Sequence, residues 1–262
     1  MNRIDCTFQR LKEQKKKAFI TFVAAGDPDL DTTKRLILEM EKNGADMVEL
    51  GVPFTDPMAE GIVIQKANIR ALEHDICLES IMDMVKELRK ETQIPLIYLL
   101  YYNSVLSFGV EKFFDQCKEV GIDAVIIPDL PIEESDEIAP YAEKTGVYHI
   151  SMVAPTSEER LQMVTKNAKG FVYCVSSMGV TGMREHITTN LERYFEPINR
   201  ICHLPKCLGF GISTPEQASL VKQYCDGLIV GSAIVNQIGI HDTPDEKVKA
   251  VGELVHSLRE AI

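Results

Sequence analysis

The carboxylates of the segment VELGVPFTDPMAEGIVIQ, residues 48–65, are the first candidates for chemistry in this chain. Glu49 lies within a run of apolar residues, where an unpaired carboxylate is costly and is normally retained for a function. Its side chain points either into the core or outward to a salt bridge at the rim. Glu60 follows in an expected loop, as a second functional carboxylate or as a surface residue. Asp56 precedes Pro57 and is better explained as a turn residue. Glu49 and Glu60 are therefore candidate functional carboxylates, and the salt bridge at the rim and the surface position remain the alternatives.

Three glycine-containing segments suit the binding of an anion. They are GVTG at 179–182, GFG at 209–211 and GS at 231–232. Glycine allows backbone N–H groups to approach an anion closely, and SAIVNQI at 232–238 predicts a short helix whose N-terminus would face the same point. Together these segments predict a phosphate site. The acidic composition is no objection, because backbone N–H groups carry no formal charge.

Composition excludes several classes of protein. The chain has 262 residues, 45% of them hydrophobic and 26% charged, which is ordinary for a globular protein. A net charge of −11 argues against a broad nucleic-acid surface. No apolar run is long enough to span a membrane and the N-terminus lacks a signal peptide, so we expect a cytoplasmic protein. Seven scattered cysteines without a C-x-x-C pair predict reduced thiols, with neither a disulfide framework nor a metal site.

The elements that must position these residues alternate along the chain. Short apolar runs predict strands buried on both faces, as in a parallel sheet. Amphipathic segments between them predict helices. Eight such units over residues 1–262 predict a single-domain (β/α)8 TIM barrel, with an extra N-terminal helix near 3–14 and a short helix after strand eight. An open doubly wound sheet is the alternative. The predicted strands are 18–25, 47–52, 95–102, 124–130, 148–154, 171–176, 206–211 and 227–232, and the helices between and after them are near 30–40, 79–91, 110–119, 133–144, 157–167, 189–201, 214–224 and 244–261.

In a barrel of this kind the active site lies at the carboxyl ends of the strands. Phe22, Tyr101, Tyr173 and Phe210 fall at such ends, where they could bind a flat apolar ring or serve as ordinary core aromatics. Lysine is absent from the predicted strand ends, because Lys206 opens its strand. A Schiff-base aldolase is therefore not expected.

These motifs resemble those of the tryptophan synthase alpha chain family. The segment 48–65 is similar to the family signature ELGVPFSDPxADGPxIQ. Further family motifs follow in order along nearly the whole chain: AAGDPD at 24–29, YYN at 101–103, PDLPIEES at 128–135, GVTG at 179–182, GFGIS at 209–213 and GSAIV at 231–235. Two positions depart from the pattern, with Glu60 where the family has aspartate and Ile62 where it usually has proline.

The resemblance implies a reaction and a role for each site residue. The family cleaves indole-3-glycerol phosphate to indole and glyceraldehyde 3-phosphate, a retro-aldol step without a cofactor. It implies that Glu49 moves the protons and that Glu60 accepts the indole N–H. It also implies an indole pocket and a phosphate site. The implied indole-side residues are Phe22, Leu99, Tyr101, Tyr173, Thr181 and Phe210, with Thr181 in a loop that closes over the substrate, and the implied phosphate ligands are Gly182, Gly211, Gly231 and Ser232.

The resemblance further implies a partner. Family members pass indole to a PLP-dependent beta chain, usually within an α2β2 complex, so PLP is expected in the partner and no cofactor or metal in this chain. Two alternatives stay open because of Glu60 and Ile62. One is a weakly catalytic subunit that binds ligand and activates a beta chain. The other is a stand-alone indole-3-glycerol phosphate lyase that releases free indole.

Overall fold

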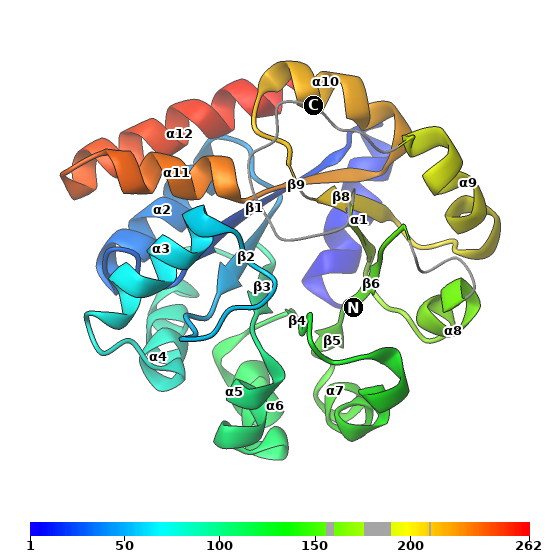
Figure 1. Cartoon of the computed structure of the whole chain (residues 1–262), viewed down its shortest axis with the longest axis horizontal. Coiled ribbons are helices and arrows are strands. Elements are labelled where there is room, and N and C mark those ends of the chain that lie inside the picture. The colour runs from blue at the N-terminus through cyan, green and yellow to red at the C-terminus, as the bar shows by residue number, and fades with distance from the viewer. Residues whose placement is uncertain (156–159, 176–189, 210) are drawn as a thin grey trace.

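The strands of the protein form a closed ring. A computed structural model describes residues 1–155, 160–175, 190–209 and 211–262. The strands are β1 (Ala18–Ala24), β2 (Met47–Gly51), β3 (Leu96–Leu99), β4 (Ala124–Ile126), β5 (Tyr148–His149), β6 (Ser151–Val153), β7 (Val172–Val175), β8 (Lys206–Gly209) and β9 (Gly227–Val230). They pair in parallel in the order β5-β4-β3-β2-β1-β9-β8-β7-β6. Because only Ile150 separates β5 from β6, the two ends of this order meet and the sheet closes (Figure 1).

The predicted barrel is confirmed, and the open sheet is wrong. Each of the eight apolar runs contains a strand, and the run 148–154 contains both β5 and β6. The strands are shorter than the runs, because the last residues of several runs leave the sheet to form the loops at the carboxyl ends. Those loops are where a barrel carries its site.

The helices surround the ring of strands, except for α1, which lies at one end of it (Figure 1). They are α1 (Arg3–Glu13), α2 (Leu30–Lys42), α3 (Ile62–Leu72), α4 (Leu78–Leu88), α5 (Tyr102–Phe108), α6 (Val110–Val120), α7 (Ala139–Thr145), α8 (Leu161–Thr165), α9 (Leu191–Ile201), α10 (Pro215–Val221), α11 (Ser232–Ile240) and α12 (Pro244–Ala261), with the 3-10 helices η1 (Ile132–Glu137) and η3 (Lys222–Tyr224). The expected short helix after the last strand is α11.

Two helices next to the site were not predicted. α3 follows the carboxylate segment, and its N-cap, Gly61, makes no side-chain capping bond. α5 has only seven residues, and its N-cap, Tyr101, likewise makes none. A helix without a capping side chain lacks the usual sequence signal for its start, and seven residues are too few to establish a helical period.

The first helix, α1, closes the barrel end that lies opposite the site. Ile4 is fully buried in the cluster that fills the barrel interior, and Phe8 packs against the same cluster. The Asn2 side chain caps the helix by accepting the N–H of Ile4 at 2.9 Å, and its amide donates to the carbonyl of Asp123 at 2.9 Å. This helix is the extra N-terminal helix that the sequence predicted.

Alternation along each strand separates the barrel interior from the helix layer. In β2, Met47 packs in the interior, whereas Val48 and Leu50 belong to the larger cluster between strands and helices. Because side chains alternate with a period of two, Glu49 points the same way as Met47, into the barrel.

No helix among the described residues is long and apolar enough to cross a membrane.

Candidate active site

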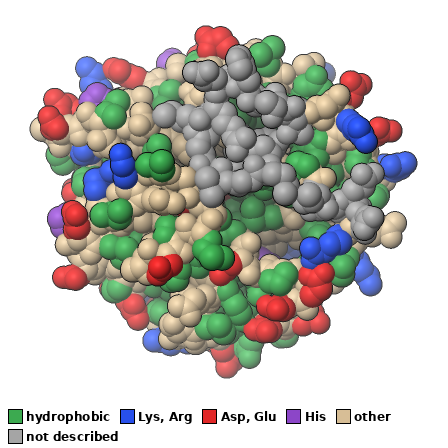
Figure 2. All heavy atoms as spheres, in the orientation of Figure 1, with side chains coloured by type: hydrophobic (Ala, Val, Ile, Leu, Met, Phe, Trp, Pro, Cys, Tyr) green, Lys and Arg blue, Asp and Glu red, His purple; other side chains and the backbone are tan. Residues whose placement is uncertain are grey.

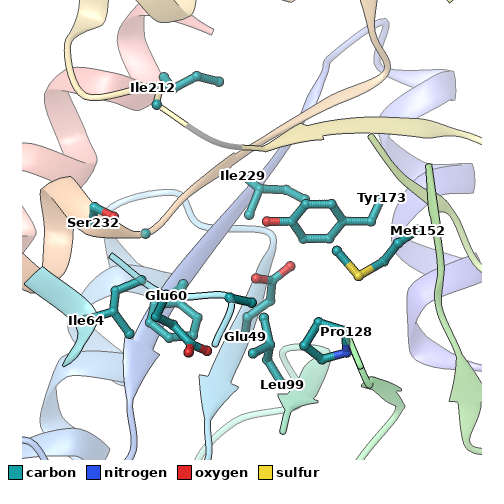
Figure 3. Close-up of a pocket in the computed structure, with 14 residues that line it drawn as sticks. Glu49, Glu60, Ile64, Leu99, Pro128, Met152, Tyr173, Ile212, Ile229 and Ser232 are labelled. Carbon is teal, nitrogen blue, oxygen red and sulfur yellow. The ribbon is translucent and has the colours of Figure 1, made fainter. Parts of the chain in front are cut away.

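A pocket opens at the carboxyl ends of the strands. Figure 2 shows hydrophobic side chains gathered at the centre of this face, where the surface is hollowed. Figure 3 shows the side chains around the pocket, with Glu49 in the middle of the labelled residues. The described residues that line it are Phe22, Glu49, Ala59, Glu60, Ile64, Leu99, Pro128, Met152, Tyr173, Gly211, Ile212, Ile229, Gly231 and Ser232. The lining is therefore largely apolar, with two carboxylic acids.

Glu49 is the buried acid of this pocket. Its side chain is 1% exposed, and its Oε1 has no hydrogen-bond partner among the described residues. Burial raises the pKa of Glu49 from its ordinary 4.5 to about 8. The cause is desolvation, which disfavours the charged form. Glu49 is therefore largely a protonated carboxylic acid at neutral pH, and its side chain belongs to the lining of the pocket.

Glu60 is the second acid, from the loop between β2 and α3. It is buried, and desolvation raises its pKa, while a hydrogen bond from Tyr101 acts in the opposite direction. The Tyr101 hydroxyl donates to Glu60 Oε2. Gln65 on α3 donates to the Glu60 carbonyl at 2.8 Å and holds the loop at this point. Glu60 therefore has a partner in the protein, whereas Glu49 has none among the described residues.

Two glycines make room for the aromatic rings of Phe22 and Tyr173, which line the pocket. A Cβ at Gly51 would lie 2.6 Å from the Phe22 ring, and a Cβ at Gly209 would lie 2.5 Å from the Tyr173 hydroxyl. Only glycine at these positions leaves room for the two rings. Leu99 lies below Glu49 in the view of Figure 3, and the ring of Tyr173 lies above it. A flat apolar ligand would therefore have Glu49 beside it.

The N-terminus of α11, which has no side-chain cap, lies at the pocket, apart from Glu49 (Figure 3). Gly231 is the N-cap of α11 and makes no side-chain capping bond, and the first turn of the helix carries no acidic residue. Ser232 is the first residue of the helix and lines the pocket together with Gly231 and Gly211. Gly211 has a φ of +86°, a conformation that glycine adopts readily. Free N–H groups at a helix N-terminus are a suitable site for a phosphate.

Most predicted site residues that can be placed lie around this one pocket. Glu49, Glu60, Phe22, Leu99 and Tyr173 line it, and so do the predicted phosphate ligands Gly211, Gly231 and Ser232. Tyr101 does not line it and lies behind Glu60 instead. Thr181, Gly182 and Phe210 fall outside the described residues.

The pocket also contains apolar residues that were not predicted. They are Ala59, Ile64, Pro128, Met152, Ile212 and Ile229. Pro128 and Met152 occupy the strand-end positions that a barrel assigns to its site, so the position alone was a usable signal. Ile64 gave no such signal, because its helix α3 was not predicted.

Known proteins share both the sequence and the fold. The sequence profile of the family described as "Tryptophan synthase alpha chain" matches residues 8–262. The tryptophan synthase alpha chain of Caldanaerobacter subterraneus subsp. tengcongensis is 51% identical over 262 residues, which cover all of both chains. The chain belongs to the tryptophan synthase alpha chain family.

Solved structures agree with this assignment. The alpha chain from Legionella pneumophila subsp. pneumophila superposes with a TM-score of 0.91 at 37% identity, over 100% of this chain and 97% of that one. A Pyrococcus furiosus structure described as the tryptophan synthase a2b2 complex superposes with a TM-score of 0.84 at 34% identity, over 92% of this chain and 97% of that one. The predicted family is confirmed, and with it the lyase class, since cleavage of indole-3-glycerol phosphate is the family reaction.

Proposed function

We propose that the pocket described above cleaves indole-3-glycerol phosphate to indole and glyceraldehyde 3-phosphate, with Glu49 as general acid and then general base. The observation that carries this proposal is the buried carboxyl group of Glu49. It is protonated at neutral pH, has an oxygen without a partner among the described residues, and faces an apolar pocket. A general acid needs a pKa near the working pH, which a Glu reaches when it is desolvated.

The reaction needs two proton transfers at one end of the substrate. Indole is a poor leaving group as a carbanion, so Glu49 first donates its proton to indole C3 and the ring becomes an iminium-like cation. Glu49 is then a carboxylate, and it takes the proton of the hydroxyl on the carbon attached to C3. The carbon–carbon bond breaks, its electrons return to the ring, and the hydroxyl-bearing carbon becomes the aldehyde.

Glu60 stabilises the cation in this proposal. Positive charge that develops on the protonated ring extends to its N–H, and a carboxylate that accepts this N–H stabilises the charge. Glu60 lines the same pocket as Glu49; burial raises the pKa of Glu60, and the hydrogen bond from Tyr101 opposes this shift by favouring the charged form. The apolar wall of Phe22, Leu99 and Tyr173 fits an indole ring.

The phosphate of the substrate binds at α11. The free N–H groups of the first turn, with Gly231, Ser232 and Gly211, suit a phosphate ester. Gly182 contributes in the same way, and Thr181 and Phe210 contact the substrate, as the family resemblance implies. Both ends of the substrate are thereby fixed, which favours a productive orientation.

A beta chain is the partner that we propose, in an α2β2 complex. The Pyrococcus furiosus relative is described as such a complex. Met58 and Ile62, on either side of Glu60, are 80% and 70% exposed, and Leu106 on α5 is 50% exposed. The exposed Met58 and Ile62, which flank the lining residue Glu60 in the chain, suit a partner that receives an apolar product. The proton transfers need only carboxyl groups of this chain, and we place PLP in the beta chain, as the family resemblance implies.

Turnover measurements test the reaction. We expect wild-type chain to cleave indole-3-glycerol phosphate, Glu49→Gln to lose at least about a hundredfold in kcat, and the matched surface variant Glu253→Gln to keep it. Equal activity of Glu49→Gln and wild type would refute the proposed role. Adding a purified beta chain separates the alternatives. Turnover that is brisk without the beta chain indicates a stand-alone lyase, and wild-type turnover as low as that of Glu49→Gln with the beta chain present indicates a subunit that only binds and activates.

Binding measurements test the partner. Sedimentation of the chain with a purified beta chain should show a complex. Ile62→Ser should weaken that complex by about tenfold or more, because an apolar side chain at an interface centre is costly to replace. Leu220, on α10, is a matched control with 68% exposure. Leu220→Ser should bind as wild type does, and an equal loss in both variants would contradict the proposed interface.

A further inference from the structure

Tyr101 occupies an unexpected place beside the pocket. The sequence suggested a ring in the pocket wall, yet the side chain is 4% exposed and does not line the pocket. It is the N-cap of α5, directly before the first helical residue, and its ring stacks on Phe54 at a centroid distance of 5.1 Å and an interplanar angle of 28°. Its contacts lie mainly with the loop that carries Glu60.

The Tyr101 hydroxyl makes two hydrogen bonds with this loop. It accepts the N–H of Ala59 at 2.8 Å and donates to Glu60 Oε2. The bond from Ala59 occupies a lone pair of the oxygen, and the single proton of the hydroxyl is used for Glu60. Burial and the bond to Glu60 raise the pKa of Tyr101, so the hydroxyl stays a donor throughout the physiological range.

We propose that Tyr101 is a positioning residue that holds the Glu60 side chain in place through its hydroxyl, an inference that rests on the proposed function. The stacked Phe54 ring and the N–H of Ala59 fix the tyrosine, and the tyrosine in turn fixes Glu60. Tyr101 acts through Glu60 and not by touching the substrate.

Glu60 needs such an anchor more than an aspartate would. The extra methylene adds a rotatable bond, so an unattached Glu60 would sample several rotamers at the pocket wall. One directed hydrogen bond selects one of them. A displacement of about 1 Å at a catalytic group can cost about a hundredfold in rate, which makes the anchor consequential.

Charge is the second effect of the contact. Burial raises the pKa of Glu60, the hydrogen bond from Tyr101 and a backbone hydrogen bond lower it, and Asp129, from the loop after β4, raises it to a smaller degree, so that the net shift is upward. Glu49 lines the same pocket but is protonated at neutral pH, so it adds no negative charge there. Among the described ionisable groups around Glu60, Tyr101 is the one whose side chain favours the carboxylate. Without it, Glu60 would retain its proton to a higher pH.

Tyr101→Phe removes this contact and keeps the ring. The experiment measures indole-3-glycerol phosphate cleavage by the full chain, alone and with a purified beta chain. We expect kcat to fall about 10- to 100-fold while KM changes less than about threefold. The acidic limb of the kcat profile should move to higher pH, because the pKa of Glu60 rises. A wild-type kcat and pH profile in Tyr101→Phe would overturn the inference.

Two further variants separate positioning from a structural role. Tyr102 is the next residue, and its hydroxyl donates to Glu137 outside the pocket, so Tyr102→Phe is a matched control that should keep wild-type kcat. Tyr101→Leu also removes the ring. If Tyr101 served only as a wall for the indole ring, Tyr101→Phe would behave as wild type and Tyr101→Leu would raise KM. A wild-type kcat in Tyr101→Phe would therefore contradict the inference.

Glu60→Asp tests whether Tyr101 acts through Glu60. The shorter side chain withdraws the carboxylate from the Tyr101 hydroxyl. Adding Tyr101→Phe to Glu60→Asp should therefore lower kcat by less than about threefold beyond Glu60→Asp itself, as expected for coupled residues. If the two losses multiply instead, Tyr101 acts independently and the inference is wrong.

A measurement without turnover completes the test. Carbon-13 NMR of labelled glutamate carboxyl groups, with Glu60→Gln for assignment, follows the pKa of Glu60 in the full chain. We expect this pKa to rise in Tyr101→Phe and to stay unchanged in Tyr102→Phe. An unchanged pKa in Tyr101→Phe overturns the inference even if no variant cleaves substrate. A wild type that fails to cleave, with the NMR difference intact, would instead refute the proposed function and support the contact.

Discussion

The buried carboxyl group of Glu49 should make the stability of the protein depend on pH in a way that Glu49→Gln removes. In the unfolded chain the group has its ordinary pKa of 4.5, and in the folded chain burial raises its pKa to about 8. Between these values the folded chain binds a proton at Glu49 that the unfolded chain has lost. The free energy of unfolding therefore falls as pH rises from about 4.5 to about 8 and then levels off.

The size of this effect follows from the two pKa values. The interval from 4.5 to about 8, at about 1.4 kcal/mol for each pH unit, amounts to about 5 kcal/mol. This figure is an upper bound, because water that enters the pocket stabilises the carboxylate. The side chain that Glu49→Gln introduces is a neutral amide at every pH. Its own burial adds a constant to the comparison, and only the wild-type Glu49 contributes the slope.

Urea unfolding of both chains at several pH values between 5 and 9 measures this slope. We expect the stability of Glu49→Gln relative to wild type to rise by up to about 1.4 kcal/mol per pH unit and to level off above about pH 8. The surface variant Glu253→Gln is the control and should differ from wild type by a constant. A constant difference for Glu49→Gln as well would refute the conclusion that Glu49 is protonated in the folded protein.

Three further outcomes are expected. The kcat for indole-3-glycerol phosphate cleavage should fall about tenfold per pH unit above about pH 8, where Glu49 loses the proton it must donate, and a flat profile to pH 10 would contradict this role in pH-rate measurements. Gly209→Ala should lower stability by about 1–3 kcal/mol and raise KM, because its Cβ would displace the Tyr173 ring; unfolding and steady-state kinetics measure both. Arg70→Met should cost about 3–5 kcal/mol in urea unfolding, because it leaves the fully buried Asp27 carboxylate without its two-bond partner. A urea midpoint of unfolding equal to that of the wild type would contradict that expectation.

Local sequence patterns were sufficient for the barrel and for much of the site. Continuous apolar runs mark strands that are buried on both faces, and their alternation with amphipathic helices leaves few folds. Glu49 was recognisable because a carboxylate in an apolar strand is costly. Gly231 and Ser232 were recognisable because glycine before a short helix suits an anion. Each of these signals lies within a few consecutive residues.

The direction in which Glu49 points was decided by the tertiary structure. The spacing along the strand requires only that Glu49 share a face with Met47, because strands alternate with a period of two. Which of the two faces is the interior depends on how the sheet closes, and this follows from pairing with strands far away in the chain. Glu49 lies in register with Phe22 on β1 and with Ile97 on β3.

The role of Tyr101 was also beyond local pattern. By itself the sequence determined an aromatic residue at a strand end, a position that suits a pocket wall. The fold instead brings its hydroxyl to Glu60, 41 residues earlier in the chain. A hydrogen bond between residues so far apart leaves no periodicity or spacing in the sequence, because its geometry is set by the strand register and by loop packing. The sequence thus determined which residues are present at the site, and the tertiary structure decided which of them touch.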